Sequence, residues 1–281
     1  MLCCWDTIGS MSNTTFSLSR PVVYSPFDNG VYKVSAGLSK LKKEKTLEID
    51  CDFHVYRAIK KQSQYSYMEI EGGMDPNFRQ RLCSLIKAKL LYSYPEYFVN
   101  KGSKFVCLLT GTVLDSSNDE TENLHALSYE IQEDIAVVKK YSETDRLDCL
   151  AVYNPSGWNP KEKLGKNFVE VHNPVADIEK LNSNSSYYID IMIHAVKGLV
   201  RFVWSCNTER VLVERQCIIG IPDYSAALFT IHPYYYNYSQ FYKTQLYKLS
   251  LAIKGMSQDS LKYKNMKNSE EILSVIYNYM D

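Results

Sequence analysis

The chain has 281 residues, of which 45% are hydrophobic, so it can bury a substantial core and is not disordered in bulk. Its 32 Lys and Arg residues balance 32 Asp and Glu residues. This balance argues against nucleic acid and against an anionic membrane surface as the main partner, because neutralising phosphates requires an excess or a stripe of positive charge.

The chain shows no membrane or secretory signal. No stretch approaches the roughly 18 uninterrupted apolar residues of a membrane span, and Met1–Ser10 lacks the basic start and long apolar core of a secretory signal. The eight cysteines are scattered, without a Cys-x-x-Cys pair or a His at zinc spacing. Reduced thiols are the simplest interpretation, so the sequence predicts a cytoplasmic location.

Three helices are predicted in the first half of the chain, because apolar residues recur there at helical spacing. They cover Phe53–Gln62, Pro76–Tyr92 and His125–Lys140. The second has the clearest start, since Asp75 suits the N-cap and Pro76 the first helical position. Gln132-Glu133-Asp134 would then lie inside the third helix.

The second half is richer in β-branched and aromatic residues and predicts a sheet. Strands are expected over Leu147–Tyr153, Val169–His172, Val200–Cys206, Val211–Ile219 and Ala227–Tyr236, and helices over Tyr187–Lys197, Tyr242–Lys254 and Ser269–Tyr279, the last with Ser269 as N-cap. Short connections between the last three strands imply an antiparallel meander. The sequence therefore predicts an α+β fold, with residues 1–20 as a flexible N-terminus and 21–281 as a single domain.

Residues 155–175 combine turn residues, aromatics and one His. Ser156-Gly157 and Asn159-Pro160 are turn signals, and Gly165 suits the end of a short helical turn because Gly tolerates positive φ. Pro174 restricts the residue before it, so His172 is expected on a short extended segment. From spacing alone, a satisfied polar side chain is the simpler interpretation, and a ligand role is the alternative.

Three further features carry candidate chemistry. Glu133 and Asp134 could transfer protons, although adjacent helical residues point in different directions and one would then be a solvated or capping residue. Arg201 on a strand could clamp a carboxylate, or could form an ordinary cross-strand ion pair. The run that begins with His232 brings several aromatics to a strand end, where they line a pocket or close the core.

Several of these segments together resemble one family, the haem-dependent oxidative N-demethylase α subunit. The resemblance rests on Pro155-Ser156-Gly157-Trp158, Glu162-Lys163-Leu164-Gly165 and Val171-His172-Asn173-Pro174-Val175, with Tyr94-Pro95-Glu96-Tyr97-Phe98, Gln132-Glu133-Asp134, Glu214-Arg215-Gln216 and Leu228-Phe229-Thr230-Ile231 in matching order. It spans roughly Phe27 to Tyr236. Several motifs in a fixed order are more specific than any one of them.

The resemblance implies a PAS-like antiparallel sheet that binds haem b. It implies a monooxygenase-type reaction, in which O2 and two electrons oxidise an N-methyl group of a small amine and formaldehyde is released. The chain shows no cysteine cluster with iron–sulfur spacing, so a separate flavin/iron–sulfur reductase would supply the electrons. The oligomeric state is left open, with a homo-oligomer among the alternatives.

The resemblance also implies roles for individual residues. His172 becomes the metal ligand, as the proximal ligand of haem iron. Arg201 and Arg215 would pair with the haem propionates, and Trp158 and Trp204 would pack on the macrocycle. Glu133 or Asp134 would hold the substrate amine or relay protons. The cofactor carries the oxidative chemistry in such an enzyme.

The chain departs from the family pattern at two positions. Val203 stands where family members carry Asn, and His232 where they carry Arg. His232 is therefore a second candidate for the axial ligand or for a catalytic residue beside the haem. Two alternative functions stay open, a non-catalytic haem-binding sensor or carrier and a haem-free interaction domain.

Overall fold

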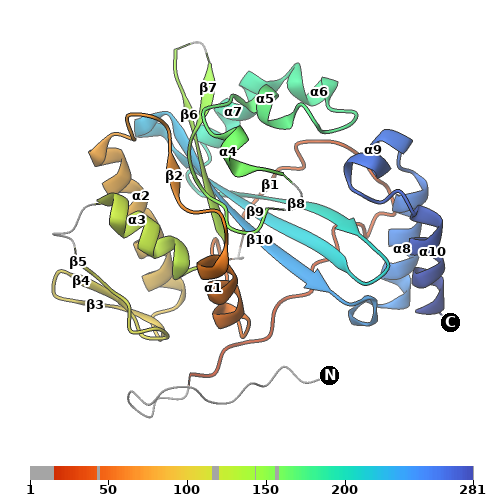
Figure 1. The fold of residues 1–281 in the computed structure, drawn as a ribbon, viewed down its shortest axis with the longest axis horizontal. Coiled ribbons are helices and arrows are strands. Elements are labelled where there is room, and N and C mark those ends of the chain that lie inside the picture. The colour runs from red at the N-terminus through yellow and green to blue at the C-terminus, as the bar shows by residue number, and fades with distance from the viewer. Residues whose placement is uncertain (1–15, 43–44, 116–119, 143, 156–157, 281) are drawn as a thin grey trace.

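The computed structural model describes residues 16–42, 45–115, 120–142, 144–155 and 158–280. Two antiparallel sheets form the framework (Figure 1). The larger has the order β1 (Ser39–Lys40), β8 (Leu199–Cys206), β9 (Val211–Ile221), β10 (Ala226–Tyr236), β6 (Asp134–Lys140), β7 (Asp145–Ala151), β2 (Met68–Glu69), and the smaller β3 (Phe98–Lys101), β4 (Lys104–Cys107), β5 (Val113–Asp115). The predicted α+β class is confirmed.

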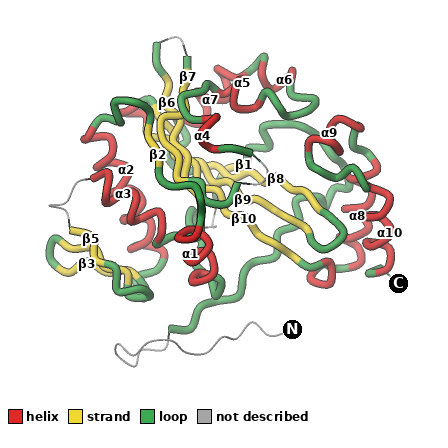
Figure 2. Tube along the Cα trace, in the orientation of Figure 1, coloured by secondary structure: helices red, strands yellow, loops and turns green. Residues whose placement is uncertain are grey.

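Helices cover the larger sheet in three groups (Figure 2). At one end of the sheet, one face packs against α1 (Phe53–Gln62), α2 (Pro76–Ser93) and α3 (Glu120–Tyr129). At the other end, the same face packs against α8 (Lys243–Lys254), α9 (Gln258–Tyr263) and α10 (Ser269–Asn278). The opposite face carries α4 (Pro160–Lys163), α5 (Phe168–His172), α6 (Glu179–Asn182) and α7 (Ser185–Ile193). Apolar clusters therefore lie on both faces of the sheet.

Most predicted elements are confirmed. The helix over Phe53–Gln62 has the predicted bounds, and Asp75 caps α2 by accepting a hydrogen bond from the backbone N–H of Phe78 at 3.0 Å. The strands predicted after Val200 form the expected antiparallel meander β8–β9–β10. Gly165 follows α4 with φ of 80°, the conformation expected at that stop.

The helix predicted over His125–Lys140 is wrong. Helix α3 ends at Tyr129, and the strand β6 begins at Asp134, so Glu133 and Asp134 are not helical. The first four residues of β6 are buried on both faces of the sheet. A strand buried on both faces reads as a continuous apolar run, which sequence periodicity does not separate from a helix.

The strand predicted over Val169–His172 is also wrong, because these residues belong to helix α5. Asn167 and Glu170 form a capping box at its start, a local signal that outweighs the alternation of two valines. The predicted N-cap Ser269 is the first residue of α10, which Asn268 precedes as the N-cap residue. The turn predicted at residues 156–157 lies outside the described part of the chain.

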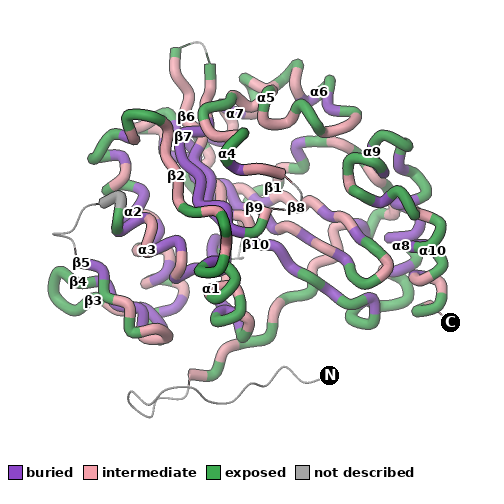
Figure 3. Tube along the Cα trace, viewed as in Figure 1, coloured by how far each residue is buried: buried purple, intermediate pink, exposed green. Residues whose placement is uncertain are grey.

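The two faces of β8, β9 and β10 differ in exposure, as the alternating colours of Figure 3 show. Along β9, Val211, Val213 and Arg215 are buried, whereas Leu212 and Glu214 between them are half-buried. We call the first side the sealed face and the second side the open face. That the sheet is PAS-like and that 21–281 is one domain stay predictions, and residues 1–15 lie outside the described part of the chain.

Candidate functional site

The open face presents half-buried side chains from three neighbouring strands: Arg201, Val203, Leu212, Glu214, Gln216, Phe229 and Ile231. Strand register brings them together, since Arg201 pairs with Gln216, and Ile231 pairs with Gln216 from the other side. Because alternate residues of a strand point to the same face, the charged and apolar members form one surface. Helix α5 borders this surface, since Phe168 and Val171 pack against the same buried apolar clusters as Phe229.

His172 ends helix α5 beside the open face. Its Nδ1 lies 2.7 Å from the backbone carbonyl oxygen of Phe168, and its ring packs on the Phe168 ring with centroids 4.2 Å apart. Because a carbonyl only accepts, Nδ1 carries the proton and Nε2 keeps its lone pair. Among the described residues, no hydrogen bond to Nε2 is found.

Burial keeps the His172 imidazole neutral. It lowers the pKa of His172 to about 4, with a further lowering by the positive charges of Arg201 and Lys163 that exceeds what the Phe168 hydrogen bond restores. A neutral imidazole with one nitrogen fixed by a backbone carbonyl is the form that ligates metals. Trp158 packs with Val171 in the same apolar cluster and lies on this side of the sheet.

Arg201 lies near His172 on the open face. The Nε of its guanidinium is buried and has no hydrogen-bond partner among the described residues. Burial lowers the pKa of Arg201, and Glu214 and Tyr263 oppose this effect. A buried guanidinium donor without a partner is costly, so the residue is suited to an anion that would satisfy it.

Asp134 also belongs to the open face, at the first residue of β6. Its carboxylate accepts a hydrogen bond from the backbone N–H of Tyr153 at 3.2 Å. Burial raises the pKa of Asp134 to about 6, Lys60 counteracts this rise, and Glu214 adds to it. The carboxylate is therefore ionised at neutral pH and can attract a cation.

Lys60 fixes the turn that leads to Asp134. This buried ammonium donates hydrogen bonds to the carbonyl oxygens of Ser128 at 2.9 Å and Ile131 at 3.0 Å, and to that of Glu133. The three carbonyls span the end of α3 and the start of β6. One side chain thus joins the helix end to the strand, as cations commonly do at helix C-termini.

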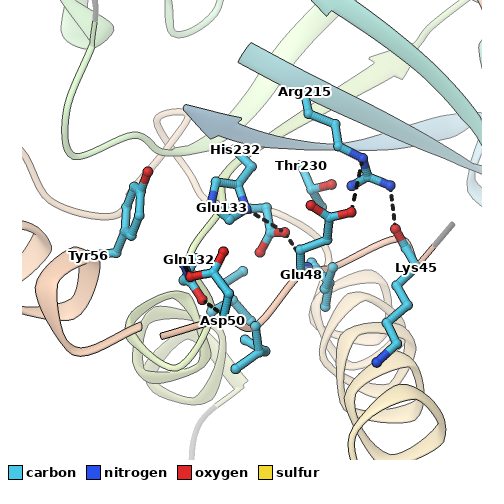
Figure 4. A network of polar contacts seen from close by, with 12 residues as sticks. Lys45, Glu48, Asp50, Tyr56, Gln132, Glu133, Arg215, Thr230 and His232 are labelled. Atoms are coloured by element: carbon cyan, nitrogen blue, oxygen red, sulfur yellow. Dashed lines mark hydrogen bonds and ion pairs between the residues drawn. The ribbon is translucent and has the colours of Figure 1, made fainter. Parts of the chain in front are cut away.

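Glu133 and His232 lie on the sealed face, in a buried polar network (Figure 4). Glu133 Oε1 accepts a hydrogen bond from the backbone N–H of Glu48 at 2.6 Å and lies 3.4 Å from His232 Nδ1. Burial alone would raise the pKa of Glu133, but these two donors lower it below its usual value. Glu133 Oε2 and His232 Nε2 are buried without a partner among the described residues.

Arg215 and Trp204 also point to the sealed face. Arg215 Nε lies 3.4 Å from Glu48 Oε1, and its guanidinium donates to the backbone carbonyl of Lys45. Trp204 packs edge-on against Phe27, with ring centroids 5.5 Å apart. The sheet thus separates the predicted residues into two groups, with His172, Trp158, Arg201 and Asp134 on one side and Glu133, His232, Arg215 and Trp204 on the other.

Sequence reasoning missed Glu48, Lys60 and Lys264. Lys60 binds carbonyls 68 to 73 residues away, and Glu48 meets Arg215 across the chain, so no local pattern signals either contact. The position of Lys60 in the last turn of a predicted helix is visible in the sequence, but that position indicates only a favourable interaction with the dipole of its own helix. Lys264 follows a six-residue helix that the sequence analysis did not predict.

One known family matches most of the chain. The model of the family described as "Haem-dependent oxidative N-demethylase, alpha subunit-like" matches residues 37–213 and 210–274 of the chain. The chain belongs to this family. The resemblance seen in the sequence is therefore confirmed. The name of this family refers to haem dependence and to oxidative N-demethylation. No curated protein matches the chain.

The side chains of the open face suit haem. Haem iron takes one or two axial ligands from the protein. No group of three or more His, Cys, Asp or Glu suited to a bare metal ion occurs among the described residues. His172 offers a lone pair, Arg201 an unpartnered donor for a carboxylate, and Trp158 an apolar wall. Within the described residues, none of the helices is long and apolar enough to cross a membrane.

Proposed function

We propose that the chain binds haem b against the open face of its sheet and oxidises a small amine with O2, as in oxidative N-demethylation. The observation that carries the proposal is the geometry of His172. Its Nδ1 is committed to the Phe168 carbonyl, its Nε2 is left with a lone pair, and its pKa of about 4 keeps it neutral. A neutral imidazole with one ring nitrogen held by a carbonyl is suited to ligate iron through the other.

The surroundings of His172 supply the other contacts that haem requires. Arg201 would bind a propionate, and Trp158 with Val171 would pack on the macrocycle. Bound haem supplies the activation of O2, and a separate flavin/iron–sulfur reductase supplies the two electrons. Overall, the N-methyl amine, O2, two electrons and two protons give the demethylated amine, formaldehyde and water.

Asp134 is the proposed residue for the substrate amine. Its carboxylate, ionised above pH about 6, would attract the ammonium form of the substrate and orient its methyl group toward the haem. Lys60 and the Tyr153 N–H hold Asp134 in place. Loss of the ammonium proton is required before the nitrogen takes part in oxidation, and Asp134 is suited to accept it.

The sealed-face residues have a different part in the proposal. Glu133, His232 and Arg215 hold β9 and β10 against the segment around Glu48 on the sealed face, and Trp204 packs against Phe27 on the same face. His232 stays the alternative axial ligand, because its Nε2 is also without a partner among the described residues. Its ring stacks on Tyr234 with centroids 4.0 Å apart and an interplanar angle of 9°, which holds the imidazole in place.

The test is the absorption spectrum of protein expressed with a haem precursor. We expect a Soret band in the wild type that is lost or strongly shifted in His172→Ala and retained in His194→Ala. His194 is a matched control, because its Nδ1 makes the same contact to the carbonyl four residues earlier, at 2.8 Å from Asp190 O, on an exposed helix end.

Two further measurements separate the alternatives. A spectrum that changes in His232→Phe and not in His172→Ala would transfer the axial ligand to His232. Formaldehyde release with O2, a reductase and a panel of N-methyl amines distinguishes the enzyme from a haem-binding sensor or carrier. Failure of the wild type to bind haem after reconstitution would overturn the proposal.

A further inference from the structure

Two cationic side chains belong to or contact the edge strand region of β8. Arg201 lies on the open face of this strand, and Lys264 reaches it from the end of α9. The ammonium of Lys264 donates a hydrogen bond to the backbone carbonyl of Trp204 at 2.6 Å, which fixes it beside the strand. Burial lowers the pKa of Lys264, and the positive charge of Arg201 lowers it further, so the two cations repel each other.

A carboxylate near the two cations compensates only part of their charge. Among the described residues, Glu214 is the one carboxylate that acts electrostatically on both Arg201 and Lys264. Its Oε2 also accepts a hydrogen bond from Gln216 Nε2 at 3.0 Å. Two cations and one carboxylate leave a surplus of one positive charge at a half-buried place, where an anion would compensate it.

The polar groups point to the kind of anion that is missing. The buried Nε of Arg201 has no hydrogen-bond partner within the described residues, and an ammonium has three donors, of which the Trp204 carbonyl takes one. A singly charged group would balance the surplus. A phosphate dianion would exceed it and would be repelled by Glu214, whereas a planar carboxylate matches both the charge and the guanidinium geometry.

We propose that Arg201 and Lys264 together form a binding site for a carboxylate group. The inference rests on the proposed function, and it adds Lys264 and the chemical class of the ligand. Two different molecules could supply this carboxylate group. The carboxylate is either a haem propionate or an acid group on the amine substrate, which would make the substrate an N-methyl amino acid.

The first arm of the experiment compares haem with haem dimethyl ester, which lacks both propionate charges. If the propionate is the ligand, wild-type protein will bind the ester about tenfold or more weakly than haem, the loss expected for one or two charge-assisted hydrogen bonds. This difference will shrink in Arg201→Gln and in Lys264→Met. Lys262→Met, an exposed lysine two residues earlier, will keep it.

The second arm compares two amines on the haem-loaded protein by their shift of the Soret band. If the substrate carries the carboxylate, N,N-dimethylglycine will bind about tenfold or more tightly than trimethylamine, and Lys264→Met will remove the preference. In that case haem and its dimethyl ester will bind alike. The two arms therefore assign the source of the carboxylate.

A third measurement uses the protein without haem, so that it tests carboxylate binding at Arg201 and Lys264 even if the protein does not bind haem. Acetate will raise the melting temperature of the wild type more than chloride at equal ionic strength, and Lys264→Met will lose the difference while Lys262→Met keeps it. The inference is overturned if acetate and chloride act alike, haem and its ester bind alike, and the two amines bind alike.

Discussion

Glu133 and Asp134 are adjacent in the sequence, yet their carboxylates lie on opposite faces of the sheet. Glu133 meets the backbone N–H of Glu48 and the His232 ring on the sealed face, and Asp134 meets the backbone N–H of Tyr153 near the open face. The backbone of β6 separates them. One carboxylate therefore stabilises the sheet, and the other is the one that we propose for the substrate amine.

Removing the Glu133 carboxylate is expected to destabilise the protein. In Glu133→Ala, the Glu48 N–H and the His232 ring lose their acceptor inside the protein. Breaking a buried pair of this kind costs on the order of 3 kcal/mol. Chemical denaturation will measure the loss, and Glu96→Ala, at an exposed position, will change the free energy of unfolding by much less. Equal effects of the two substitutions would contradict the supporting role of Glu133.

Lys60 is expected to matter for both stability and Asp134. Lys60→Met leaves the carbonyls of Ser128, Ile131 and Glu133 without their donor and is expected to lower the free energy of unfolding by about 3 kcal/mol. Lys61→Met, at the exposed neighbouring position, will have little effect. Infrared titration of the carboxyl groups will show a higher pKa for Asp134 in Lys60→Met, because Lys60 lowers that pKa in the wild type. An unchanged pKa of Asp134 would contradict the electrostatic effect of Lys60 on this carboxyl group.

The sequence predicted the class of the fold and the strands that carry Arg201 and His232, because alternation and β-branched residues are local signals. It did not assign the residues to faces of the sheet. Alternation shows that Arg215 and Glu214 point apart, but which side helices seal depends on segments far along the chain. The contact of Lys60 with Glu133 spans 73 residues and has no sequence signature.

The candidate site was predictable in part for the same reason. His172 stood out through its motif, although the short helix that fixes its tautomer was interpreted as a strand. Asp134 stood out as a carboxylate, but the helix predicted around it hid its place at the start of β6. The residues that position the site, such as Lys60 and Lys264, could be found only once the chain was folded.

Axial ligation by His172 is expected to resist acid. Its pKa of about 4 lies below the ordinary value of 6.5, so protons compete for its imidazole only near pH 4. The Soret band of the haem-loaded protein will therefore keep its position down to about pH 5. A ligand that is lost with a midpoint near pH 6.5 would contradict this assignment.

The same shift makes the protein without haem less stable in acid. Between pH 6.5 and 4 the unfolded chain binds a proton at His172 and the folded chain does not, so the free energy of unfolding falls as the pH falls. One such proton corresponds to a slope of about 1.4 kcal/mol per pH unit. Denaturation at several pH values will show a slope smaller by this amount in His172→Phe, and an unchanged slope would contradict the buried neutral imidazole.

Binding of an amine cation is expected to follow the ionisation of Asp134. Its pKa of about 6 lies above the ordinary aspartate value of 3.8, so affinity will rise as the pH increases through 6 and level off above 7. The charged or titratable groups facing it are Lys60, Glu214, Tyr153 and Tyr235. Asp134→Asn will remove the inflection in an amine titration, and an inflection that survives this substitution would assign it to another group.

The strand order of the larger sheet determines which strands lack a partner while the chain is being synthesised. Residues 134–139 of β6 pair with residues 226–231 of β10, so a growing chain presents β6 long before its partner exists. Until then β6 is an edge strand that is apolar on both sides, the kind that adds to other chains. A chain truncated before residue 226 would leave this edge of β6 unpaired, and we expect it to aggregate more readily than the full chain.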